Sequence, residues 1–112
     1  MNTSYSIMKM VIKMKFGLSD EIYIKIKNIA NKYNKYNFLI FGSRARGDFK
    51  YNFDIDIAIR GEITKIDEFN ILNEFDLLEL PYTIDVVFFN KIEKQELIKS
   101  IQTEGVFIND TF

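Results

Sequence analysis

Three short segments of this chain have the apolar pattern of strands. Asn37–Phe41 (N-F-L-I-F) is a nearly continuous apolar run that Gly42 closes, which is typical of a buried strand. Asp54–Ile59 alternates between polar and apolar residues with a period of two. Thr83–Phe89 is rich in β-branched and aromatic residues and is interrupted only by Asp85. The pattern therefore predicts three strands.

The segment before the first strand contains a helix and an N-terminal extension. Ser19 precedes two acidic residues, which suit the positive end of a helix dipole, and this predicts a helix from there to about Lys35. Its apolar positions are Ile22, Ile26, Ile29 and Tyr33. The first 14 residues fit neither a strand nor a helix. We therefore treat residues 1–18 as an extension, with Met14 as a second candidate start, and residues 19–112 as one domain.

Two further helices are predicted in the second half of the chain. Thr64 can cap the first of them, which we expect Pro81 to end. Asn90 can cap the other, which stops near Gly105. The apolar positions of the helix after Thr64 step by three and are Ile66, Phe69, Leu72, Phe75 and Leu78. The order of elements predicts a small α/β or α+β domain, with helices packed against a central sheet.

Composition narrows the chemistry that this domain can perform. Its 112 residues include no cysteine and no histidine, which removes thiolate metal sites and the commonest general base. Catalysis must then use carboxylates, hydroxyls, lysines or metal ions held by oxygen. The net charge of -1 gives no general attraction to nucleic acid or to an anionic membrane. No apolar run reaches the roughly 20 residues of a membrane span, and we expect a soluble cytoplasmic protein.

Asp54 and Asp56 occupy alternate positions of a predicted strand, so both carboxylates point to the same face. Two unit charges about 4 Å apart repel each other by several kcal/mol at an effective dielectric constant of about 20. One carboxylate therefore stays protonated or a cation lies between them. Oxygen ligands without histidine or cysteine favour Mg²⁺ or Mn²⁺. The alternative is a strand whose polar face is only solvated.

Asp85 strengthens the case for a metal site. An aspartate in the middle of an apolar strand is unfavourable unless it has a partner. If its strand lies beside the strand of Asp54 and Asp56, three carboxylates share one face of the sheet. Such a set can hold the two metal ions of a phosphoryl-transfer site. The alternative is an exposed residue on an edge strand.

A turn with candidate phosphate ligands follows the first predicted strand. Gly42 permits close approach of the backbone to a ligand, and Ser43 can open a helical turn with free amides and a hydroxyl. Arg44 and Arg46 add positive charge that suits a triphosphate or a leaving pyrophosphate. Taken alone, the segment also fits a surface turn with two solvated arginines.

Together these residues resemble the motif of a known superfamily. Gly42-Ser43, ten residues and then Asp54-x-Asp56, with Asp85 in a later strand, is similar to the pattern of nucleotidyltransferases of the DNA polymerase β type. The string G-S-R-A-R-G-D resembles most the minimal nucleotidyltransferase (MNT) subgroup. This chain departs from the family pattern at Phe53, where relatives often carry a small residue. The larger side chain would change the shape of the wall of the nucleotide pocket. The resemblance implies a small central mixed β-sheet flanked by helices.

The resemblance also implies a role for each candidate residue. Asp54 and Asp56 would hold Mg²⁺ on a nucleoside triphosphate such as ATP. Asp85 would complete the metal site and help to deprotonate the attacking hydroxyl. Ser43 and the amides around Gly42 would bind the β- and γ-phosphates. The reaction would transfer a nucleoside monophosphate and release pyrophosphate, with catalysis supplied mostly by positioning and charge neutralisation.

The acceptor implied by the resemblance is a protein. Family members of this size are commonly encoded beside an all-helical HEPN ribonuclease toxin and act as its antitoxin, and some transfer AMP to a tyrosine of that toxin. This implies a protein adenylyltransferase that forms a hetero-oligomer with a HEPN toxin. Two alternatives are a small-molecule nucleotidyltransferase, acting for instance on an aminoglycoside, and an antitoxin that acts by occlusion alone. The near-neutral charge disfavours a nucleic-acid polymerase fragment.

Overall fold

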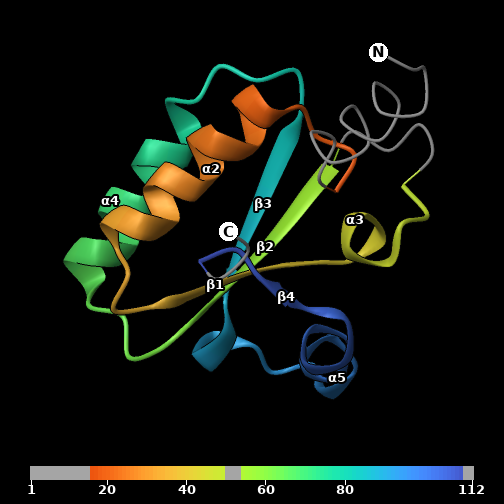
Figure 1. The fold of residues 1–112 in the computed structure, drawn as a ribbon. Coiled ribbons are helices and arrows are strands. Elements are labelled where there is room, and N and C mark those ends of the chain that lie inside the picture. Colours follow the sequence, from red (N-terminus) through yellow and green to blue (C-terminus); the bar gives the residue numbers. More distant parts are fainter. Residues whose placement is uncertain (1–15, 50–53, 110–112) are drawn as a thin grey trace, which may run out of the picture.

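A mixed sheet of four strands forms the centre of the described part of the protein, residues 16–49 and 54–109 of a computed structural model. The strands are β1 (Asn37–Phe41), β2 (Asp54–Arg60), β3 (Thr83–Phe88) and β4 (Val106–Phe107), in the order β3-β2-β1-β4 (Figure 1). β1 runs antiparallel to β2 and β4, whereas β2 and β3 are parallel. The three predicted strands and the fold class are confirmed. The interpretations of residues 1–15 and of Phe53 lie outside the described residues.

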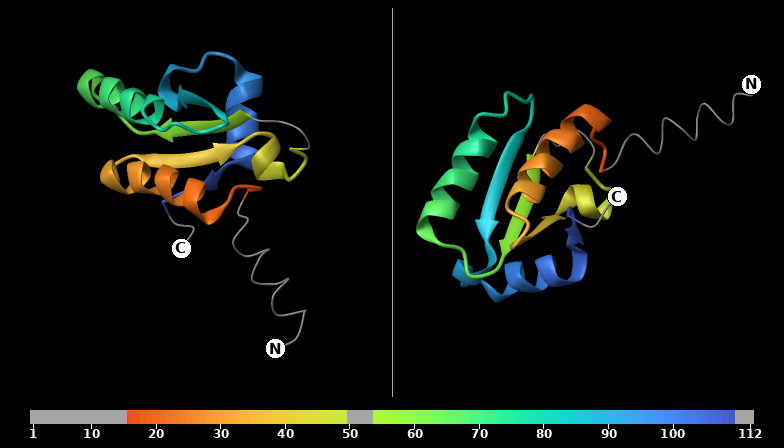
Figure 2. Two further views of the ribbon diagram at one scale, coloured as in Figure 1. Left: turned by 90° about the horizontal axis from the view of Figure 1, so that it is seen from above. Right: turned by 60° about the vertical axis from the view of Figure 1, so that its left-hand side comes forward.

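The helices lie on both faces of this sheet (Figure 2). α2 (Asp20–Lys32) and α4 (Lys65–Asp76) share one hydrophobic core with the sheet, and α5 (Gln95–Glu104) packs in a second core on the other face. The short α3 (Ser43–Arg46) follows β1, and a single 3₁₀ turn, η1 (Phe89–Lys91), follows β3. None of the helices in the described ranges is long and apolar enough to cross a membrane.

The side chains of β2 alternate between the two faces of the sheet. Ile55, Ile57 and Ile59 are fully buried in the core under α2 and α4. The alternate positions face the other way, because successive side chains of a strand point to opposite faces. On that side, Ala58 is buried under α5, whereas Asp54 lies exposed beyond the cover of this helix. The strand thus presents carboxylates on a face that its helix covers only in part.

Two of the predicted helix starts are confirmed by side-chain caps. The Ser19 hydroxyl accepts a hydrogen bond from the Ile22 amide at 3.4 Å, and the Thr64 hydroxyl accepts one from the Asp67 amide at 3.1 Å. Each cap satisfies an amide that has no partner within its own helix. The local sequence therefore determines where α2 and α4 begin.

One predicted helix end and one predicted helix start are wrong. α4 ends at Asp76, before Pro81, because the chain has to reverse there to begin β3. Asn90 does not cap the last helix: it lies in η1, and its side-chain amide donates a hydrogen bond to the Gly61 carbonyl at 2.7 Å. α5 begins only at Gln95, after Lys94, which makes no side-chain cap.

The prediction for the inner side of α4 is also partly wrong. Phe75 is buried as the apolar pattern suggests, but Ile66 and Phe69 point to solvent, and Ile71 is buried in their place. The helix has apolar residues on two opposite sides, so its sequence pattern alone does not determine which side packs on the sheet.

Candidate active site

The turn after β1 brings the backbone against a carboxylate. Gly42 has φ +73°, a conformation that side-chain-bearing residues rarely adopt. A Cβ at this position would lie 2.5 Å from the Asp56 Oδ2 atom, which is far closer than a carbon atom can approach. Glycine is therefore required both for the backbone conformation and for the space.

Ser43 begins α3, as predicted, and hydrogen bonds close the turn behind it. The Arg46 amide donates to the Gly42 carbonyl at 3.0 Å, and the amides of Gly47 and Asp48 donate to the Ser43 carbonyl at 2.8 and 3.1 Å. Gly47 ends the helix with φ +92°, in the left-handed region. These bonds hold the Gly42-Ser43 backbone in one conformation beside Asp56.

The sheet brings Asp85 next to Asp56. β2 and β3 are parallel, and these two residues are paired in register, while Asp54 is paired with Thr83. Because neighbouring strands lie about 4.8 Å apart, paired residues present their side chains to the same face at close range. The condition for Asp85 to join the aspartate pair, that its strand lies beside theirs, is met.

Burial and the neighbouring carboxylates raise the pKa of Asp56. Burial raises the pKa of the Asp56 carboxyl, and the charges of Asp85 and Asp54 raise it further, whereas Arg46 lowers it. Each of the first three causes disfavours the ionised form. The site therefore favours any cation that can neutralise Asp56.

The three aspartates fit a hard cation by their chemistry. They supply only carboxylate oxygens, on one face of the sheet, and Asp54 and Asp85 are exposed. Within residues 16–49 and 54–109, however, no three acidic side chains converge closely enough to form a complete metal site. The backbone thus places the ligands side by side, and rotation of their side chains would be needed to enclose an ion.

Arg44 has a structural environment that its sequence position does not reveal. Its side chain is 5% exposed, and the guanidinium donates hydrogen bonds to the carbonyls of Asp54 and Phe16, both at 3.0 Å. It also stacks on Phe49 and Tyr82, with ring centroids 4.9 and 4.8 Å away. Arg44 therefore ties the start of β2 to the turn, and a direct contact with a phosphate stays a prediction.

Arg46 lies at the edge of the site and is exposed. It forms ion pairs with Asp48 at 3.2 Å and with Glu104, the last residue of α5, at 3.0 Å. Both carboxylates raise the pKa of Arg46. Sequence reasoning missed Glu104, because nothing in the local pattern links residues that are 58 positions apart.

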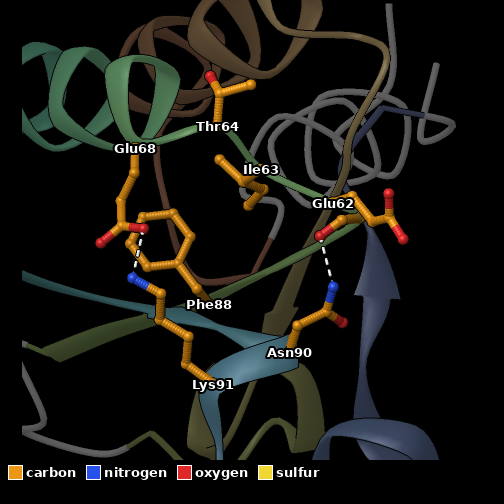
Figure 3. Close-up of a pocket in the computed structure, with 8 residues that line it drawn as sticks. Glu62, Ile63, Thr64, Glu68, Phe88, Asn90 and Lys91 are labelled. Atoms are coloured by element: carbon orange, nitrogen blue, oxygen red, sulfur yellow. Dashed lines mark hydrogen bonds and ion pairs between the residues drawn. The ribbon is translucent and has the colours of Figure 1, made fainter.

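A pocket of about 230 Å³ lies at the other end of the sheet (Figure 3). It is formed after the ends of β2 and β3, between the start of α4 and η1, and the ion pair of Lys91 with Glu68 spans 2.6 Å beside it. The carboxylates instead lie toward the beginning of β2. This pocket is therefore no part of the predicted site.

Comparison with known proteins agrees with this fold. The family described as Polymerase beta, Nucleotidyltransferase matches residues 24–111. No curated protein matches the sequence. One solved structure, a crystal structure of a toxin-antitoxin with AMP-PNP, resembles the protein with a TM-score of 0.58 and 22% sequence identity, covering 77% of this chain and 71% of that chain. At this identity the likeness concerns the fold.

The class of protein follows from these observations. A mixed sheet that carries a glycine turn against one of three neighbouring aspartates is the arrangement expected of a nucleotidyltransferase. The family match covers most of the chain. The chain belongs to the polymerase β nucleotidyltransferase family, which confirms the resemblance stated from its motifs.

Proposed function

We propose that this protein is an MNT-type, magnesium-dependent protein adenylyltransferase that transfers AMP from ATP to a tyrosine hydroxyl of a HEPN ribonuclease toxin and so acts as its antitoxin. The observation that supports this most is the contact of the Gly42 backbone with Asp56, which is itself paired in register with Asp85. A turn suited to phosphate and a set of acidic metal ligands thus adjoin each other.

The chain's own residues would divide the work of the reaction. Asp54, Asp56 and Asp85 would hold Mg²⁺, which would neutralise charge on the triphosphate. Ser43 and the amides beside Gly42 would bind the β- and γ-phosphates. Asp85 would also accept the proton of the tyrosine hydroxyl. The hydroxyl oxygen would then bond to the α-phosphorus while the bond from this phosphorus to the β-phosphate oxygen breaks, and pyrophosphate would leave.

Two observations support a protein as the acceptor. The structurally similar crystal structure is that of a toxin-antitoxin with AMP-PNP, and its fold is shared with this chain. Among the described residues, Asp54 and Asp85 are exposed and Asp56 is half-buried, which leaves room for a large acceptor. We propose a cytoplasmic hetero-oligomer of this chain with the toxin.

Transfer can be tested with ATP labelled at the α-phosphate. We expect Mg²⁺-dependent label on a tyrosine of a HEPN ribonuclease toxin supplied as the acceptor, and none when that protein is left out. The double variant Asp54→Asn, Asp56→Asn should lose the label. Glu93→Gln, an exposed acidic residue outside the site, should keep it.

Two outcomes would contradict the proposal and favour its alternatives. Label on an aminoglycoside, and never on the HEPN protein, would indicate a small-molecule enzyme. Full suppression of the toxin by the double variant, with no label on the toxin in any reaction, would indicate an antitoxin that acts by occlusion.

A further inference from the structure

α4 exposes a row of large apolar residues on the side that faces away from the sheet. Ile66, Phe69 and Leu77 are 73%, 70% and 70% exposed, and Leu72 is 39% exposed. At 100° per residue, the first three fall within about 80° of one another around the helix axis. We call Ile66, Phe69, Leu72 and Leu77 the α4 stripe. Figure 2 shows no described element on this side of α4.

The stripe is unusual for a small monomeric protein. Single exposed apolar residues are common, but several large apolar side chains on one side of a helix, here with the exposed Asn70 and Asn73 among them, are typical of an interaction surface. The opposite side of the same helix, with Ile71 and Phe75, already supplies the packing on the sheet. The stripe is therefore not needed for the fold.

The charges around the stripe indicate what covers it. Most acidic residues of α4 are neutralised within the protein: Asp67 pairs with Lys35, Glu68 with Lys91 and Glu74 with Lys32. By contrast, Asp76 and Glu79, on either side of Leu77, are exposed and form no ion pair in the described part of the chain.

Asp76 is also unfavourably placed for an isolated helix. It is the last residue of α4, where the helix dipole is negative, and the last turn contains no basic residue. Lys65, at the positive end, is exposed and likewise has no ion pair among the described residues. A partner with a cation opposite Asp76 and a carboxylate opposite Lys65 would compensate both ends.

We infer that the α4 stripe is the docking surface for an amphipathic helix of the partner protein, with apolar residues at helical spacing and Lys or Arg beside Asp76 and Glu79. The inference rests on the proposed function, which supplies a helical partner. It adds that docking takes place on the side of the sheet that α2 and α4 cover, opposite the aspartates. Binding of the partner and nucleotide transfer are then separable by substitution.

The test measures binding of this 112-residue chain to the same HEPN toxin. Phe69→Lys should raise the dissociation constant at least about 30-fold, as is typical of a central apolar contact. Asp76→Lys should weaken binding as well, and the difference from the original chain should shrink at high salt. Ile24→Lys, an exposed apolar residue of α2 outside the stripe, is the matched control and should bind normally.

Folding and nucleotide binding are measured on the same variants. Because these side chains are exposed, far-UV circular dichroism and the thermal midpoint should stay close to those of the original chain. Binding of AMP-PNP with Mg²⁺ should also be unchanged, because the aspartates lie on the other face. A variant that lost its circular dichroism would be replaced by Phe69→Ser.

Three results would overturn the inference. Unchanged binding of Phe69→Lys to the HEPN protein would place the docking surface elsewhere while the proposed function stands. Self-association that Phe69→Lys abolishes, without any effect on the HEPN complex, would assign the stripe to a second copy of this chain. No complex between the original chain and the HEPN protein would reject both the inference and the proposed partner.

Discussion

Gly42 and Asp56 lie in direct contact, with no room between the glycine backbone and the carboxylate for even a methyl group. Gly42→Ala should therefore displace Asp56 and also force alanine to adopt φ +73° and ψ −152°, a backbone conformation that is essentially restricted to glycine, at about 1–3 kcal/mol for the backbone alone. We expect nucleotide transfer to fall by at least about 100-fold, since small displacements of catalytic groups have effects of that size. Initial rates with labelled ATP measure this.

Gly47→Ala is the matched control for Gly42→Ala. Gly47 also has a positive φ, of 92°, but a Cβ there would meet nothing within 4 Å. Gly47 lies in the left-handed region, so this variant should lose about 1–2 kcal/mol of folding free energy in urea unfolding, and it should keep most of its transfer activity. Equal losses of activity in both variants would show that strain in the turn, and not the contact with Asp56, is the cause.

Asp56→Asn should stabilise the protein at neutral pH when divalent cations are removed. The raised pKa of Asp56 means that the folded state holds this proton more strongly than the unfolded chain, so ionisation destabilises the fold as pH rises through the acidic range. The advantage of the variant should disappear below about pH 3.9, where aspartate is protonated in both states. Thermal midpoints in EDTA across this range measure it.

Mg²⁺ provides the complementary experiment on Asp56. Adding Mg²⁺ should raise the thermal midpoint of the original chain, because bound cation removes the repulsion, and should have a smaller effect on Asp56→Asn. A variant that is less stable than the original chain in EDTA at every pH would contradict the electrostatic account.

Arg44→Lys should destabilise the fold by about 2–3 kcal/mol, because one ammonium group cannot replace two hydrogen bonds to separate carbonyls and the stacking on two rings. Urea unfolding monitored by circular dichroism measures this. Arg60→Lys is the control: Arg60 also lies over two aromatic rings, Phe89 and Phe107, and should change by less than about 1 kcal/mol. Equal losses of stability in both variants would contradict this, because they would show that the hydrogen bonds of the Arg44 guanidinium to the two carbonyls add no stability beyond the ring contacts.

Glu104→Gln should weaken nucleotide binding without slowing the chemical step. Glu104 holds Arg46 at the edge of the site, so its loss should raise KM for ATP by roughly threefold to tenfold at unchanged kcat. Glu68→Gln removes a similar exposed ion pair at the other end of the sheet and should leave KM unchanged. A fall in kcat for Glu104→Gln, or an equal shift in both variants, would contradict a positioning role.

The elements of this fold could be predicted from local sequence, because their signals are local. Ser19 and Thr64 cap their helices through amides three residues away, and the alternation in β2 follows from the geometry of a single strand. The orientation of α4 could not be predicted in the same way. With apolar residues on two sides, only the packing of the whole domain decides that Ile71 is buried and Phe69 exposed.

In the candidate site, too, the features with local sequence signals could be predicted and the long-range contacts could not. The aspartates and Gly42 carry a chemical signal in their residue types and spacing, and the sheet places them together. The environments of Arg44 and Arg46 depend on residues far away in the chain, including Phe16 and Glu104, which have no distinctive motif. Long-range partners of this kind become visible only when the chain is folded.

The position of β3 at the margin of the sheet has a consequence for substrate size. Among the described strands, β3 pairs only with β2, and Asp85 on it is exposed. If Asp85 acts as proposed, an acceptor hydroxyl that belongs to a folded macromolecule would approach it from this margin of the sheet. Within residues 16–49 and 54–109, no strand lies beyond β3 to narrow the entrance for bulky molecules. Discrimination among acceptors has to come from surfaces that recognise them at a distance from the reacting atoms.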